Sequence, residues 1–181
     1  SMNGIAVSAL NTGVIKAINF SVGGGATAAA ALNAGVDIVN MTTEVHIADN
    51  VTLNSGGDVV IAAGADLQKL GVTGAVSGAG TAAGVAGADV TLVSMNTHVE
   101  LNADSGPVTI TAGPTGDVLI NAQAQEDILA ITAGFAASGV ASLDAGATVV
   151  KIDNNTLAAT VGGPAHITAG GNVLVQASDD T

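Results

Sequence analysis

The chain has 181 residues, of which 48% are hydrophobic and only 1% aromatic, so thin layers of small aliphatic side chains suit it better than a thick globular interior. Its 15 acidic residues and three lysines give a net charge of −12, which makes nucleic acid and anionic membrane surfaces poor partners. There is no cysteine, which excludes a disulfide framework and thiolate chemistry. No apolar run is long enough for a transmembrane helix, so no membrane insertion is expected.

A β-strand motif begins directly after Ser1 and Met2, which are typical of the scar of a cleaved expression tag. The motif NGIAVSA at 3–9 returns as GDVVIAA at 57–63, GDVLINA at 116–122 and GNVLVQA at 171–177. In each copy aliphatic residues alternate with other residues, as in a strand with one buried face. The pattern predicts that Val59, Ile61, Val118, Ile120, Val173 and Val175 point into the core, and that Asp58, Asn121 and Gln176 point out.

These copies divide the chain into repeats, which are residues 3–56, 57–115 and 116–170, with a partial repeat at 171–181. Residues 5–47 align with 59–101, and these in turn align with 118–160, without any gap. We therefore predict one domain over residues 3–181, a single fragment of a repetitive fold. The extra residues of the middle repeat fall at 102–115, where prolines and turn dipeptides predict a surface excursion. Asp104, Asp179 and Asp180 are expected to be loop charges.

Four further apolar rows follow the opening strand in each repeat, and all are expected to line a shared core. They are Ile18, Val72 and Ile131, with Phe20, Val22, Val76 and Phe135 close behind; Val36, Val90 and Val149, with Val39, Val93 and Ile152; Val45, Val99 and Ala158, with Ile47, Leu101 and Thr160; and Val51, Leu53, Val108, Ile110, Ala165 and Ile167. Between the first two rows, the Gly- and Ala-rich segments 23–32 and 78–87 are predicted to be narrow strands or extended turns. Corners are expected at SGG (55–57) and AGG (169–171), where glycine can adopt a positive φ.

About six short strands in each repeat, joined by Gly, Asn and Asp corners, predict an all-β fold. The economical arrangement is a parallel β-solenoid (β-helix), in which successive coils stack about 4.8 Å apart and like residues form ladders. A three-faced coil of about 27 residues makes each repeat two coils. The alternative is one wide coil per repeat.

Longer phrases of the repeat resemble a known class of bacterial proteins. The phrases are VDIVNMTTEVHI (36–47), VTLVSMNTHVEL (90–101), VVKIDNNTLAAT (149–160), VTITAGPTGDVLINAQA (108–124) and AHITAGGNVLVQASDD (165–180). They are similar to the repeats of large filamentous bacterial adhesins, the filamentous-haemagglutinin-like and leukotoxin-like exoproteins that are secreted with a dedicated outer-membrane partner. The resemblance covers essentially the whole chain. It implies a right-handed parallel β-helix, an extracellular or cell-surface location, and a role as a stalk or adhesive fibre segment with a ligand on a host or cell surface.

Histidine and glutamate recur together at one position of the first two repeats. At an offset of 54 residues, Glu44 lies opposite His98 and His46 lies opposite Glu100. A metal site needs three or four converging ligands, and the third repeat offers Leu157 and Ala159 at these positions. The sequence therefore predicts a solvated ladder of charges and no metal site.

Asp58 and Asp117 recur at the start of the opening strand, and Asn172 takes their place in the partial repeat. The tightly spaced motifs of a calcium-binding β-roll are missing at steps of 54–59 residues, so these side chains are expected to stabilise corner turns. No residue is predicted to be catalytic or to bind a cofactor, since no catalytic triad or phosphate-binding loop is present.

The sequence thus predicts a non-catalytic structural or interaction segment. The alternatives are a carbohydrate-active β-helix enzyme that uses the 102–115 excursion, which the lack of Tyr, Trp and Arg disfavours, and a surface-layer-type structural protein. An outward row of Val60, Leu119 and Leu174 is expected either to be covered by residues 102–115 or to mediate self-association. End-to-end association is also expected, with the coil of Val173 and Val175 meeting the coil of Ile5 and Val7 of a neighbour.

Overall fold

The computed structural model describes residues 3–101 and 105–181, with the side chains of residues 154–156 left out, so the predicted tag scar at 1–2 and Asp104 lie outside it. Within these ranges the chain is all β, as predicted, and none of the described residues forms a helix that could cross a membrane. The strands are β1 (Ile5–Gly25), β2 (Ala28–Ile47), β3 (Thr52–Asn54), β4 (Val59–Ala79), β5 (Ala82–Leu101), β6 (Val108–Thr111), β7 (Val118–Ser138), β8 (Ala141–Val161), β9 (Ala165–Thr168) and β10 (Val173–Asp180).

The strands form three parallel sheets, ordered β1-β4-β7-β10, β2-β5-β8 and β3-β6-β9. Each strand pairs with its counterpart one full repeat later, so that Ile5 pairs with Val59 and Val59 with Val118. One repeat is therefore one circuit of the three sheets. The prediction of two coils and about six short strands per repeat is wrong, because Gly and Ala positions that suggested corners stay extended within strands of 20 or 21 residues.

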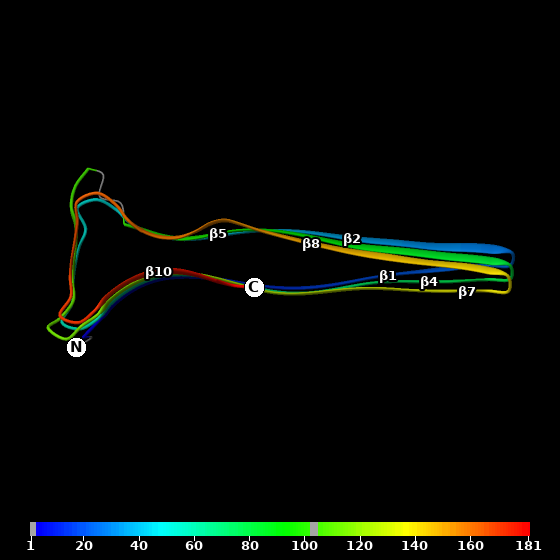
Figure 1. Cartoon of the computed structure of the whole chain (residues 1–181), viewed down its shortest axis with the longest axis horizontal. Helices are drawn as coiled ribbons and strands as arrows, with labels where there is room; N and C mark the ends of the chain where they lie inside the picture. Colours follow the sequence, from blue (N-terminus) through cyan, green and yellow to red (C-terminus); the bar gives the residue numbers. More distant parts are fainter. Residues whose placement is uncertain (1–2, 102–104) are drawn as a thin grey trace.

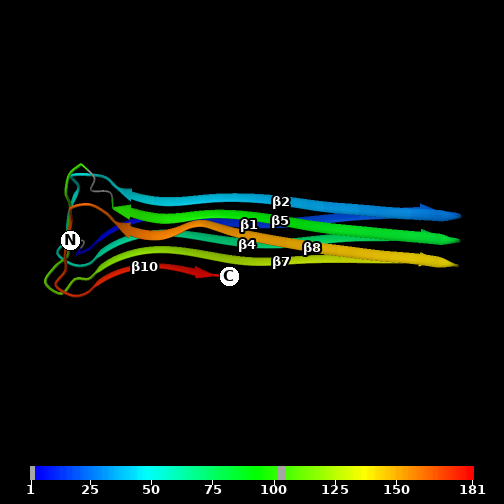
Figure 2. The same cartoon turned by 45° about the horizontal axis from the view of Figure 1, so that its top comes forward.

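The two long sheets lie face to face as two layers over most of their length (Figure 1). At one end β1 passes into β2 through residues 26–27, as β4 and β7 pass into β5 and β8 through residues 80–81 and 139–140. The predicted strand or extended turn at 23–32 is thus two strand ends and the turn between them. At the other end the layers separate and the short sheet joins them, which gives a broad end and a narrow two-layer part. Figure 2 shows the strands of successive repeats stacked side by side in both layers.

Large aliphatic residues fill the broad end. Val59, Ile61, Val118 and Ile120 are completely buried, which confirms the register predicted from the opening strand. They pack with the last residues of β2 and β5 and with the short sheet, including Val45, Val99, Leu101, Val108 and Ile110. Val173 and Val175 are 49% and 43% exposed, so the prediction that they are buried is wrong. They continue the same row by register, but β10 is the edge strand of its sheet.

In the narrow part the large apolar side chains face outward and the small side chains face inward. The alternation that starts at Ile5 continues without a break to Gly25, so Ile18, Phe20 and Val22 point away from the interior. Ile18 is 75% exposed and Phe20 63% exposed, and the same orientation recurs at Ile131 and Phe135. Because the layers are close here, the interior accepts small residues such as Ala31, Ala75 and Ser77. The prediction that these rows and the row of Val36, Val90 and Val149 line the core is wrong, whereas Val39, Val93 and Ile152 do pack against a core cluster.

An irregularity in β8 changes the register of the third repeat. Met95 pairs with Asn154 and Asn96 with Thr156, so Asn155 is one residue more than the partner strand has. Beyond it Val99 pairs with Ala159, so the predicted gapless alignment and the inward positions of Ala158 and Thr160 are wrong. Leu157 and Ala159 pack against the core instead. The extra residue therefore keeps the aliphatic side chain of Leu157 on the inner face of β8.

The corner glycines serve close packing between repeats. Asn50 and Gly163 are the described residues with positive φ, so the expectation that the glycines of SGG and AGG use that conformation is wrong. A Cβ atom on Gly57 would overlap the carbonyl oxygen of Asn3, and one on Gly170 would overlap that of Pro114. Glycine is therefore required where one corner stacks directly on the next.

Candidate functional site

The His–Glu cluster, which comprises Glu44, His46, His98 and Glu100, lies on the outer face of β2 and β5. Glu44 pairs with His98 and His46 with Glu100, as the sequence predicted. Glu44 Oε1 is 3.3 Å from His98 Nε2, and His46 Nδ1 is 3.5 Å from Glu100 Oε2. Between these side chains Val45 and Val99 point the opposite way into the core. A well-packed part of the fold therefore holds two neighbouring imidazole–carboxylate pairs on one face.

The charged triad, which comprises Lys69, Asp37 and Asp89, lies between the two layers of the narrow part. The Lys69 ammonium is completely buried, 2.8 Å from Asp37 Oδ2 and 3.8 Å from Asp89 Oδ1, and it donates a hydrogen bond to the hydroxyl of Thr91. Asp89 is 2% exposed, whereas the side chain of Asp37 is 24% exposed. Lys69 belongs to β4 and its partners belong to β2 and β5, so these contacts connect the two layers.

Sequence reasoning missed the charged triad because it took Val72 and Val76 as inward residues. The signal was present in the alternation of the opening strand. Continued from Ile61 without a break, that alternation places Lys69 on the inner face. The 54-residue offset also places Asp37 beside Thr91, which is the hydroxyl partner of Lys69.

A hollow of about 600 Å³ lies on the outer face of the opening strands at the corner. Its floor is the row of Val60, Leu119 and Leu174, and its rim includes Asp58, Asp117 and Asn172. The rim side chains stabilise the corner as predicted, since Asp58 Oδ1 accepts a 2.9 Å hydrogen bond from the Asp117 amide and Asp117 Oδ1 accepts a 2.6 Å bond from the Asn172 amide. Leu174 is 49% exposed, so the outward row is at least partly open to solvent.

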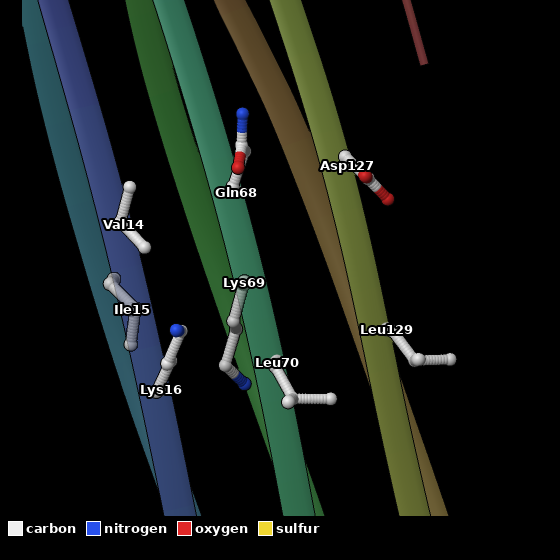
Figure 3. Close-up of a pocket in the computed structure, with 8 residues that line it drawn as sticks. All are labelled: Val14, Ile15, Lys16, Gln68, Lys69, Leu70, Asp127 and Leu129. Carbon is white, nitrogen blue, oxygen red and sulfur yellow. The ribbon is translucent and has the colours of Figure 1, made fainter.

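A second, shallower hollow of about 270 Å³ lies across β1, β4 and β7 in the narrow part (Figure 3). The register places Lys16, Leu70 and Leu129 in one row, and the row two residues earlier holds Val14, Gln68 and Asp127. In Figure 3, Leu70 and Leu129 extend in the same direction from neighbouring strands. Apolar groups and opposite charges therefore share this surface.

Both outer faces of the narrow part are rich in exposed aliphatic and aromatic residues. On the sheet of β1, β4 and β7 these are Leu10, Val14, Ile18, Phe20, Val22, Leu129, Ile131 and Phe135, and on the sheet of β2, β5 and β8 they are Leu32, Val36, Ile38, Leu143 and Val149. Exposed apolar surface of this extent is typical of sites of contact with another molecule.

Comparison of the chain with protein-family models, with curated proteins and with solved structures gives no match. The function is therefore argued from the geometry of the described residues. The corner carboxylates accept hydrogen bonds from main-chain amides, and the charged triad is enclosed between the layers, so both contribute first to the structure. The surfaces that remain for recognition are the two apolar faces, the two hollows and the His–Glu cluster.

Proposed function

We propose that the chain is a segment of a right-handed parallel β-solenoid with one coil per repeat. In this proposal it acts as a non-catalytic stalk or adhesive fibre of a secreted or surface-displayed bacterial adhesin of the filamentous-haemagglutinin-like class. The observation that carries the proposal is the pairing of whole repeats, residue by residue, from Ile5 through Val59 and Val118 to Val173. Repeats that stack in this way build an elongated body of uniform cross-section, which suits a stalk.

The exposed apolar faces support the interaction part of the proposal. A stalk needs only a core and corners, whereas this chain also carries Phe20 and Phe135 on its outer surface. Such groups favour binding to a partner surface. The net charge of −12 directs that binding toward neutral or basic partners.

The full-length gene product and its location test this proposal. We expect a secretion domain upstream, further copies of the repeat, and recovery of the protein from the medium or the outer surface of the producing cells. A full-length product without further repeats that is recovered from the cytosol contradicts the proposal.

A carbohydrate-active enzyme is the alternative from another class, and Asp58 and Asp117 beside the corner hollow are its candidate acids. Incubation of the purified chain with a panel of polysaccharides should release no reducing ends. Cleavage that Asp117→Asn abolishes, in a variant with unchanged thermal unfolding, would replace the structural proposal by the enzymatic one.

A further inference from the structure

We infer that the His–Glu cluster is a binding site for a divalent transition-metal ion, Zn²⁺ in the first place. This inference is independent of the proposed stalk function. Ligand atoms of Glu44, His46 and Glu100 all lie within 4.8 Å of one another. His98 lies beside this group of three, with its Nε2 3.3 Å from Glu44 Oε1.

The distances within the cluster are of the size found between ligand atoms that share one metal ion. Nitrogen–oxygen hydrogen bonds measure about 2.7–3.2 Å, whereas the two imidazole–carboxylate distances are 3.3 and 3.5 Å. Zn²⁺ binds imidazole nitrogen and carboxylate oxygen at about 2.0–2.1 Å, and in a tetrahedron this places the ligand atoms about 3.3–3.4 Å apart. A single ion held by Glu44, His46 and Glu100 therefore fits the spacing of these groups, and water can complete its coordination.

Charge and ligand type narrow the choice of ion. With neutral imidazoles the two carboxylates leave a local charge of −2, which one divalent cation cancels on a surface that is already acidic. Imidazole ligands favour zinc, copper and nickel over magnesium and calcium, which prefer oxygen ligands.

The fold holds this cluster in place and leaves it accessible. Val45 and Val99, which alternate with the ligands along the strands, are 5% and 0% exposed, so the ligand backbones are fixed by the core. On the neighbouring strand β8, Ala158 and Thr160 pair with His98 and Glu100, and neither side chain offers a strong competing ligand. The sequence argued against a metal because the third repeat lacks ligands, but two adjacent strands already bring three ligand atoms within 4.8 Å of one another.

Isothermal titration of the metal-free chain with Zn²⁺ tests the inference. We expect saturable binding of about one Zn²⁺ per chain, weakened at least about 10-fold by His46→Ala and by Glu100→Gln. The matched control is His166→Ala, which removes the exposed histidine of β9 outside the cluster and should leave binding unchanged. Binding should also weaken as the pH falls, because a protonated imidazole cannot ligate.

Two further measurements keep the test decisive. Co²⁺ in place of Zn²⁺ should give the intense visible absorption bands of a four-coordinate ion, and these should be missing in His46→Ala. Zn²⁺ should raise the unfolding temperature of the wild type and of His166→Ala, but not that of His46→Ala. The inference fails if the wild type does not bind Zn²⁺, if the cluster variants bind it as the wild type does, or if His166→Ala removes the binding.

Discussion

Lys69 is the residue whose environment departs most from that of an ordinary lysine. Its ammonium is fully buried and lies beside the carboxylates of Asp37 and Asp89 across the gap between the layers. Breaking such a buried pair by removing one partner typically costs about 3–5 kcal/mol, because the remaining charge stays buried. We therefore expect the charged triad to oppose any sliding of one layer over the other.

We predict that Lys69→Met lowers the free energy of unfolding by about 3–5 kcal/mol, since it leaves Asp37 and Asp89 without their cation. Lys16→Met on the neighbouring strand is the control, because Lys16 is exposed, and it should change stability by less than about 0.5 kcal/mol. Urea denaturation measures both. If the two variants are equally stable, the charged triad contributes little.

Ile120 provides the corresponding test of the apolar core, since it is completely buried in the broad end. Ile120→Asp places a carboxylate among aliphatic side chains, and we expect a loss of at least about 3 kcal/mol in unfolding free energy. Gln123→Asp on the same strand adds the same charge at an exposed position and should have little effect. A melting temperature for Ile120→Asp that stays within error of the wild type would show that the register is wrong.

Among the elements, β8 is the one strand with a shift in its pairing within the described sheets. An extra residue changes which side chains face inward beyond it, and in β8 this keeps Leu157 and Ala159 in the core. The third repeat therefore tolerates one more residue than its neighbours without moving its hydrophobic set to the outer face.

Deletion of Asn155 should accordingly change stability by less than about 1 kcal/mol, because the remaining residues already pair as a regular strand would. Deletion of Asn96 from the regular strand β5 should be far more harmful, since it moves the inward residues Thr97, Val99 and Leu101 to the outer face. Thermal unfolding followed by circular dichroism compares the two deletions. Equal losses would mean that Asn155 is an integral part of the pairing.

The success of the sequence predictions also differed between elements. The opening strand, the rows at Val45 and Val99 and the short sheet could be placed, because large aliphatic residues alternate there with polar ones. The narrow part could not, because its period-two pattern sets Ile18 and Phe20 on one face and small residues on the other, and the larger side chains suggested the wrong interior. Only the spacing of the layers decides which face is inside.

The two candidate sites also differ in how far the sequence predicted them. The pairs of the His–Glu cluster followed from the 54-residue offset alone, since parallel strands in register place equivalent residues side by side. The charged triad needed the face assignment of β4 as well, and that assignment was wrong in the sequence prediction. Contacts within a sheet therefore followed from the repeat offset alone, whereas contacts between sheets also required the correct inner face of each strand.

At the scale of the whole molecule, the edge strands of the three sheets determine how two molecules can associate end to end. β1, β2 and β3 form one set of edges, and β8, β9 and β10 form the other. The last repeat of the stack is incomplete, because only β10 represents it in the described sheets. β10 pairs only with the first part of β7, up to Gln125. A neighbouring molecule that places its β1 on β10 therefore leaves a gap of one strand beside β8.

We predict end-to-end association that increases with salt, because screening at 0.1 M reduces the range of repulsion between acidic chains to about 10 Å. A variant that lacks residues 171–181 ends its stack on a complete repeat, so it should associate more strongly than the full chain. Light scattering across a salt and concentration series measures both. A chain that stays monomeric throughout, in both forms, would show that its edges are protected.

The pairing of each repeat with the next also determines how the molecule responds to tension. A force that pulls on the two ends of the chain peels the outermost repeat first, because its strands pair on one side only, so the repeats should detach one after another. Counterparts in successive repeats are 54 or 59 residues apart, since Ile5 pairs with Val59 and Val59 with Val118, and each detachment lengthens the chain by at most roughly 180–210 Å. A stack of such repeats under tension would therefore unwind in steps and absorb mechanical work at each of them, a property that suits the proposed stalk.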